Sequence, residues 1–127
     1  MPTEFVHENI ELVLYLTGIP TAAMLGVFLL PRFVLRLATG VEPADYIGVF
    51  FLRHWGMLTG VVGLMLAAAV SMPELRAPAM MAATCTKASL VVMILVNMSN
   101  ALGRGLWLVL AFDFACVVLY VLYLLGL

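Results

Sequence analysis

Four apolar segments, each long enough to cross a lipid bilayer, make up most of the 127-residue sequence. They cover about residues 10–30, 46–70, 77–101 and 105–127. The hydrocarbon core of a bilayer is about 30 Å thick and an α-helix rises about 1.5 Å per residue, so about 20 apolar residues form one span. Helices satisfy their backbone polar groups internally, as lipid requires. The sequence therefore predicts an all-α, integral membrane four-helix antiparallel bundle that forms a single domain over residues 1–127.

The composition agrees with lipid as the surrounding solvent. Hydrophobic residues make up 65% of the sequence and charged residues 10%, which leaves too few polar side chains to cover a water-exposed surface. The net charge is −1, and the Lys and Arg residues are scattered singly. Because such a pattern gives no basic face for phosphates to bind, we expect the lipid bilayer as a partner and no nucleic acid.

The connection between the first two segments differs from the other connections. Residues 32–38 place Arg32 and Arg36 among apolar residues. This pattern predicts a short interfacial segment, with its apolar side chains at the headgroup boundary and its arginines toward lipid phosphates. An ordinary loop is the open alternative.

The arginines indicate how the chain is oriented in the membrane. Arg32, Arg36, Arg53 and Arg104 lie on one side of the predicted bundle, whereas Arg76 lies on the other. The positive-inside rule places the arginine-rich connections in the cytoplasm. We therefore expect a multi-pass protein with both termini on the outer side.

Ionisable residues inside the spans are candidates for a functional site. A charge at the centre of a bilayer costs at least about 2.5–3.5 kcal/mol, so such a residue usually faces a partner or a cavity. Arg53 and Asp113 lie at similar depth on the cytoplasmic side, which predicts an ion pair between them. The predicted buried polar cluster consists of Arg53, His54, Asn97, Asn100 and Asp113. The pair either sets the helix register or lines a substrate or proton site; alternatively, Arg53 extends to the interface and stays unpaired.

A stripe of small residues predicts where the second helix packs. At 100° per residue, Gly56, Gly60, Gly63 and Ala67 share one face with Arg53. Small residues allow two helix backbones to approach closely in lipid. We therefore expect these four residues to form the helix-packing face.

Lys87 is the remaining intramembrane charge, and its predicted place is in the outer half of the third helix. No acid of the second or fourth helix is expected at its depth, and Glu11 near the outer end of the first helix is the nearest candidate. A lysine side chain can extend along its helix to the interface. The sequence thus predicts that Lys87 reaches outward without a buried partner.

Metal and haem sites find little support in the sequence. His7 and His54 fall on opposite sides of the predicted bundle, which excludes bis-His haem ligation, and no acidic cluster suggests zinc or di-iron. Cys85 and Cys116 form no C-x-x-C pair and are expected to be free thiols. We expect no metal and no resident cofactor; a lipid, quinone or pigment near His54 and Trp55 is the hypothesis that stays open.

The layout also carries a resemblance to a known group. It rests on a first helix that ends at residues 29–31, a second helix that begins with the arginine–glycine segment 51–56, and a turn at residues 73–76. Over about residues 10–95 the chain resembles small four-helix bacterial membrane proteins of the DoxX-like group. Better-studied members are linked to thiosulfate and quinone redox chemistry, usually as membrane subunits beside another protein. The resemblance implies a bacterial cytoplasmic (inner) membrane location and a subunit role, and it transfers no catalytic residue.

The function expected from these observations is not enzymatic, because the sequence contains no recognisable catalytic motif. We predict a small accessory subunit that packs in a homo-oligomer or against a larger membrane complex, with other membrane proteins as partners. Two alternatives stay open. One is a small proton-coupled transporter that uses Asp113, Arg53 and Lys87 as coupling residues. The other is a quinone- or pigment-binding redox membrane protein.

Overall fold

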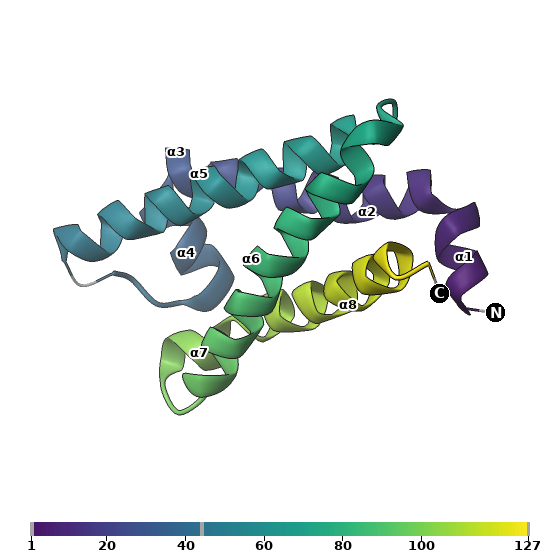
Figure 1. The fold of residues 1–127 in the computed structure, drawn as a ribbon. Coiled ribbons are helices and arrows are strands. Elements are labelled where there is room, and N and C mark those ends of the chain that lie inside the picture. The colour runs from purple at the N-terminus through teal and green to yellow at the C-terminus, as the bar shows by residue number, and fades with distance from the viewer. Residues whose placement is uncertain (1, 44, 127) are drawn as a thin grey trace.

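The chain folds into helices joined by short connections throughout residues 2–43 and 45–126, which a computed structural model describes, with side chains from residue 5 onward (Figure 1). Met1, Ala44 and Leu127, all part of the single predicted domain, lie outside the described residues. Four helical stretches are long and apolar enough to cross a membrane. They are Ile10–Leu29, Tyr46–Ala68, Pro73–Val96 and Trp107–Leu124. This confirms the all-α class and the four membrane-length helices.

The first stretch is interrupted, and consists of α2 (Ile10–Ala22) followed by α3 (Leu25–Leu29). The interruption lies just after Pro20, which has no backbone N–H to donate within α2. There the backbone changes to tighter bonds between residues three apart, such as Met24 N–H to Thr21 O at 3.1 Å. The interruption divides the first stretch into two parts. The first part, α2, contains the buried Thr17 and Thr21, and the second part, α3, leads to the arginines of residues 32–38.

The segment after α3 forms a short helix, α4 (Pro31–Thr39), where the sequence left an interfacial segment or a loop as alternatives. Pro31 occupies the first turn, where its missing N–H causes no loss, and Gly40 ends the helix in the left-handed conformation with φ of 74°. Leu35 is buried, whereas Arg32 and Arg36 are exposed. The helix therefore turns Leu35 toward the protein, whereas its two arginines and the apolar Phe33 and Leu37 are exposed.

Helix α5 (Tyr46–Ala68) runs along α2 and α3 (Figure 1). Asp45 caps its start by accepting a hydrogen bond from the Gly48 N–H at 2.8 Å. The three glycines of the predicted packing face are buried against the first stretch, and Ala67 beside them is half-buried. A methyl group added at Gly56 would lie only 2.7 Å from Cβ of Val27, so the close approach requires glycine there.

The turn after α5 leads through a short 3-10 helix, η1 (Pro73–Leu75), into α6 (Arg76–Val96). The half-buried Arg76 side chain donates to the Ala69 and Val70 carbonyl oxygens at 3.0 and 2.9 Å. These carbonyls lie at the end of α5, where helices leave acceptors without partners. Arg76 thus joins the end of one long helix to the start of the next.

Two helices follow α6: α7 (Ala101–Gly105) and α8 (Trp107–Leu124). The sequence placed the end of the third long helix near residue 101 and the start of the fourth at Gly105, whereas α6 ends at Val96 and α8 begins at Trp107. Asn100 begins α7 by accepting a hydrogen bond from Gly103 N–H at 3.0 Å. The connection is therefore a short capped helix.

A further helix, α1 (Pro2–Glu8), which the apolar pattern of the sequence did not predict, packs against α8 near the end of the chain (Figure 1). The His7 ring stacks on the Tyr123 ring with centroids 4.6 Å apart. Val6 is buried beside them. The main core lies between α2, α5, α6 and α8. Its buried members are Ile10, Val13, Leu14, Leu66, Ala69, Ala79, Met80, Ala83, Cys116 and Tyr120.

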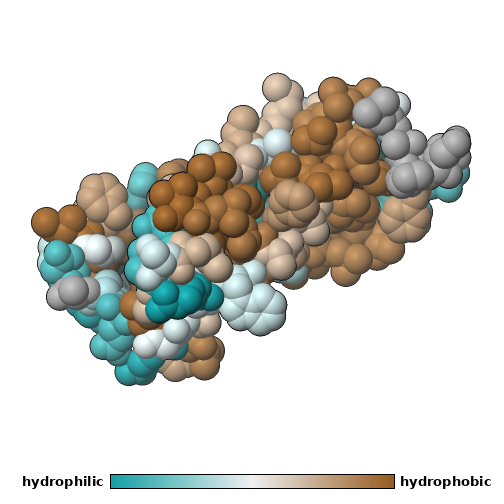
Figure 2. All heavy atoms as spheres, turned by 90° about the horizontal axis from the view of Figure 1, so that it is seen from below, coloured by the Kyte–Doolittle hydropathy of each residue, from teal (hydrophilic) through white to brown (hydrophobic). Residues whose placement is uncertain are grey.

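The surface is divided by hydropathy. Figure 2 shows hydrophobic residues over most of the visible face, with hydrophilic residues gathered at the end that contains α4 and α7 in Figure 1. Many large apolar side chains along the long helices are exposed, among them Leu16, Phe51, Val92 and Phe114. Length, composition and surface together fit a multi-pass membrane protein.

Candidate functional site

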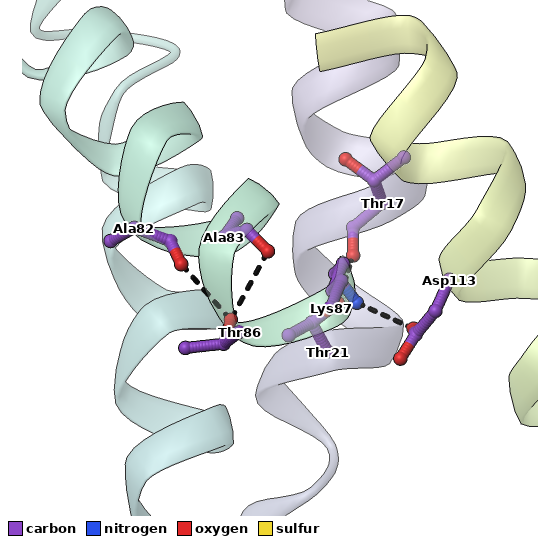
Figure 3. Close-up of polar contacts among 7 residues, drawn as sticks. All are labelled: Thr17, Thr21, Ala82, Ala83, Thr86, Lys87 and Asp113. Carbon is purple, nitrogen blue, oxygen red and sulfur yellow. Dashed lines mark hydrogen bonds and ion pairs between the residues drawn. The ribbon is translucent and has the colours of Figure 1, made fainter. Parts of the chain in front are cut away.

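An ion pair is buried where α2, α6 and α8 meet. The Lys87 ammonium on α6 donates to Oδ1 of Asp113 on α8 at 2.9 Å (Figure 3). Their side chains are 4% and 6% exposed. The Lys87 nitrogen also lies 4.9 Å from the centre of the Phe112 ring, within range of a cation–π contact. The two charges neutralise each other inside the protein, which is how buried charges are tolerated.

Helix α2 supplies a third wall to this site. Thr17 and Thr21 are buried on the face of α2 that Figure 3 shows near Lys87 and Asp113. Their hydroxyls donate to carbonyl oxygens one turn earlier, Val13 O at 2.7 Å and Thr17 O at 2.6 Å. Such bonds leave a hydroxyl oxygen able to accept a further hydrogen bond. The threonines thus line the α2 side of the site with polar groups. Their burial costs little free energy, because each hydroxyl donates to a carbonyl of the same helix.

Two more buried hydroxyls lie on the same helix faces as the ion pair. Thr84 precedes Lys87 by one turn of α6, and Tyr120 follows Asp113 by two turns of α8. Within the described residues, neither Oγ1 of Thr84 nor the Tyr120 hydroxyl has a hydrogen-bond partner. A buried polar group without a partner costs free energy, so these two hydroxyls extend the polar surroundings of the ion pair at some cost in stability.

The ion pair differs from the predicted Arg53–Asp113 pair. Arg53 is exposed, and its Nε donates to the Phe28 carbonyl oxygen at 3.0 Å. Its guanidinium also lies 5.5 Å from the centre of the Phe28 ring. Because Pro31 has no N–H and stops α3, carbonyls at the end of that helix accept from side chains instead. Arg53 therefore caps α3, and Asp113 is left to Lys87.

The other members of the predicted buried cluster lie elsewhere. His54 is exposed on α5 and Trp55 beside it is half-buried. Asn97 and Asn100 are exposed in the connection after α6, where Asn100 Nδ2 donates to Asn97 Oδ1 at 3.2 Å. The amide of Asn97 donates to Met93 O at 2.7 Å. Of the predicted cluster, Asp113 alone lies at the buried site, because the asparagines terminate helices.

Lys87 was expected to extend outward toward the interface, and the structure instead buries it against Asp113. Glu11, its predicted acidic neighbour, lies 4.0 Å from the Arg76 guanidinium. The signal that identifies the correct pair is depth. Eleven residues separate Arg76, the start of α6, from Lys87, and eleven separate Asp113 from Leu124, the end of α8. Because these two helix ends lie on the same side of the protein, the two charges fall at the same level.

Metal binding finds no site in the described part of the chain, where no group of three or more His, Cys, Asp and Glu residues comes together. Cys85 is exposed and Cys116 is buried, both as free thiols in these residues. Comparisons with protein-family models, with curated proteins and with solved structures find no match to this chain.

Proposed function

We propose that this chain is a multi-pass membrane protein, a four-helix antiparallel bundle, that acts as a non-enzymatic subunit. It packs in a homo-oligomer or against a larger membrane complex. In this proposal the arginine-rich end with α4 and α7 faces the cytoplasm, and both termini lie on the outer side of a bacterial inner membrane. The DoxX-like resemblance points to the same subunit role.

The observation that carries the proposal is the difference between the two faces of α6, one buried within the chain and the other exposed. The inner face contributes Lys87, whose charge is neutralised within the chain by Asp113. The outer face exposes small polar residues, Cys85, Thr86 and Ser89. The hydroxyls of Thr86 and Ser89 donate to carbonyls of the same helix, Ala82 O at 3.0 Å and Cys85 O at 2.8 Å. Small polar residues whose hydroxyls bond within their own helix suit close contact with another helix in lipid, and the large apolar Met81 and Val92 are exposed on the same face.

Cross-linking through Cys85 tests the subunit role. Oxidation in native membranes, or a short bis-maleimide, is expected to join Cys85 to a second copy or to a larger partner protein. The Cys85→Ser chain is expected to lose that product, whereas Cys116→Ser keeps it, because Cys116 is buried. A single monomeric species, both in membranes and after mild detergent extraction, would contradict the proposal.

A second candidate function has its own supporting observation. Thr84 and Tyr120 carry buried hydroxyls without partners in the described residues, on the same helix faces as Lys87 and Asp113. Groups of this kind can hold a proton or a small polar substrate between charged residues. The site therefore also supports a small proton-coupled transporter in which Asp113 and Lys87 are the coupling residues.

Flux measurements separate this candidate from the subunit role. In proteoliposomes with a pH gradient, a coupled transporter is expected to dissipate the gradient in the presence of substrate, and Asp113→Asn abolishes that flux. Thr86→Ala, a change on the exposed face of α6, is expected to keep it. If the native protein dissipates no gradient against a panel of small cations and amines, the transporter role is excluded for those substrates and the subunit role stands.

A further inference from the structure

A cleft beside α3, α4 and α5 is lined by arginine and apolar side chains. It has a volume of about 450 Å³. Its lining residues are Leu29, Leu30, Pro31, Arg32, Phe33, Arg36, Val49 and Arg53. The cleft lies away from the Lys87–Asp113 pair, and neither His54 nor Trp55 lines it. It is therefore separate from the ion pair and from the surroundings of His54 and Trp55.

The three arginines keep donors available in this cleft. Arg53 bonds to Phe28 O through Nε, and its two terminal nitrogens make no hydrogen bond with the described residues. Arg32 NH1 makes one long bond, 3.3 Å, to Pro43 O. Arg36 NH1 lies 3.2 Å from the Glu42 carboxylate, and both of these side chains are more than half exposed. One carboxylate thus offsets three guanidinium groups, and the cleft carries an excess of positive charge.

The apolar part of the lining is exposed as well. Leu29, Leu30 and Phe33 are 66%, 59% and 52% exposed. Apolar side chains beside guanidinium groups match a ligand with an anionic head and a hydrocarbon chain. Guanidinium groups hold phosphate oxygens in a two-pronged geometry that a lone ammonium does not offer. The lining therefore matches a ligand that carries both a phosphate group and an acyl chain.

We propose that this cleft binds an anionic phospholipid. Arg32, Arg36 and Arg53 contact its phosphate, and the acyl chain lies along Leu29 and Leu30. This inference rests on the membrane placement proposed above, in which α4 lies at the cytoplasmic interface where lipid phosphates are found. The bound lipid neutralises Arg53, which lies about two turns into α5 and would otherwise bring an unpaired charge below the headgroups.

Native mass spectrometry of the full chain, after exchange into nanodiscs of equal phosphatidylglycerol and phosphatidylcholine with identical acyl chains, tests the site. We expect the protein to carry phosphatidylglycerol in excess through detergent release. An arginine near a membrane surface contributes about 1 kcal/mol, so each one removed is expected to weaken lipid retention roughly fivefold. Arg32→Gln combined with Arg36→Gln is therefore expected to reduce the excess roughly 25-fold.

Two further variants separate a lipid site from general surface charge and from misfolding. Arg104→Gln removes an exposed arginine at the same end of the molecule but outside the cleft, and should retain lipid as the native chain does. Glu42→Gln releases Arg36 from its carboxylate and is expected to increase retention severalfold. Loss of the Arg36–Glu42 ion pair could only weaken the fold, and a weakened fold is expected to retain less lipid. A gain in lipid retention with Glu42→Gln therefore reports the freed arginine.

Several outcomes would overturn the proposal. These are equal retention of the two lipids, an equal loss with Arg104→Gln, or no gain with Glu42→Gln. Phosphate adducts that form at millimolar inorganic phosphate without any phosphatidylglycerol excess would show that the cleft binds free phosphate instead. Failure of the subunit role appears separately, as a monomer in the cross-linking experiment. Failure of membrane placement appears as release of the chain from membranes by alkaline carbonate.

Discussion

Replacement of Asp113 by leucine is expected to lower the free energy of unfolding by about 3–5 kcal/mol, because it leaves the Lys87 ammonium buried without a counter-charge. Lys87 is 3% exposed, so its charge has no path to water in the folded chain. The loss is measured by denaturant titration in mixed micelles, with helix content followed by circular dichroism. Asp113→Asn is expected to fall between the native chain and Asp113→Leu, since an amide still accepts a hydrogen bond.

The matched test of this prediction removes both charges together. Lys87→Met with Asp113→Leu is expected to recover most of the loss, because replacing a buried ion pair by apolar residues of similar size is often neutral or stabilising. Thr86→Met is the control beside it, since Thr86 is exposed and points away from Asp113 (Figure 3). A loss in the double variant equal to the sum of the losses in Lys87→Met and Asp113→Leu alone would show that the residues do not interact.

The double variant also separates the two roles of the site. If the pair only holds α6 and α8 in register, a folded Lys87→Met, Asp113→Leu chain is expected to cross-link through Cys85 as the native chain does. If the pair is part of a transport path, the same chain folds but carries no substrate. The double variant thus keeps stability while it tests function. A single substitution at Lys87 or Asp113 would change both at once.

The helices followed from the sequence because the length of an apolar segment is a local property. About 20 apolar residues predict a span whatever the rest of the chain does, and the four stretches confirm it. The interruption between α2 and α3 is local as well, because Pro20 predicts a kink in the first helix wherever the rest of the chain lies. The helix α1 did not follow. It depends on contacts made in the folded state, such as the stacking of His7 on Tyr123 at the far end of the chain.

The partner of Asp113 was missed because helix ends were placed a few residues away from where they lie. With the fourth helix drawn from residue 105 to 127, Asp113 stands fourteen residues from its outer end, and Lys87 stands ten from the start of the third helix. That difference of four residues is about 6 Å of rise, enough to separate two side chains. The structure ends α8 at Leu124 and begins α6 at Arg76, which brings both charges to one level.

Arg53 was misassigned for a different reason. Its place on the glycine face of α5 correctly directs it toward the first stretch, but what it meets there is the free end of α3 beside Pro31. A carbonyl oxygen left by a broken helix is not visible in a pattern of apolar and polar residues. The glycines, by contrast, act through their own small size, so their spacing alone was informative.

Substitution of Gly63 by alanine is expected to lower the free energy of unfolding by about 2–3 kcal/mol, the upper part of the usual range for overpacking. An added methyl group would lie 2.6 Å from Cα of Ala22 and closer still to the Ala22 backbone nitrogen. Backbone atoms cannot rotate aside as a flexible side chain can, so α2 and α5 must move apart along their shared face. Denaturant titration in mixed micelles measures the loss.

Gly26→Ala is the matched control, because the same methyl group there lies 3.8 Å from Cγ2 of Val34, an ordinary contact distance. Alanine favours a helix over glycine by up to about 1 kcal/mol, so this variant is expected to be neutral or more stable than the native chain. The helix preference of alanine also stabilises Gly63→Ala, so the steric overlap with α2 must cost more free energy than this preference contributes. A Gly63→Ala chain as stable as Gly26→Ala would mean that α2 and α5 do not approach closely at this point.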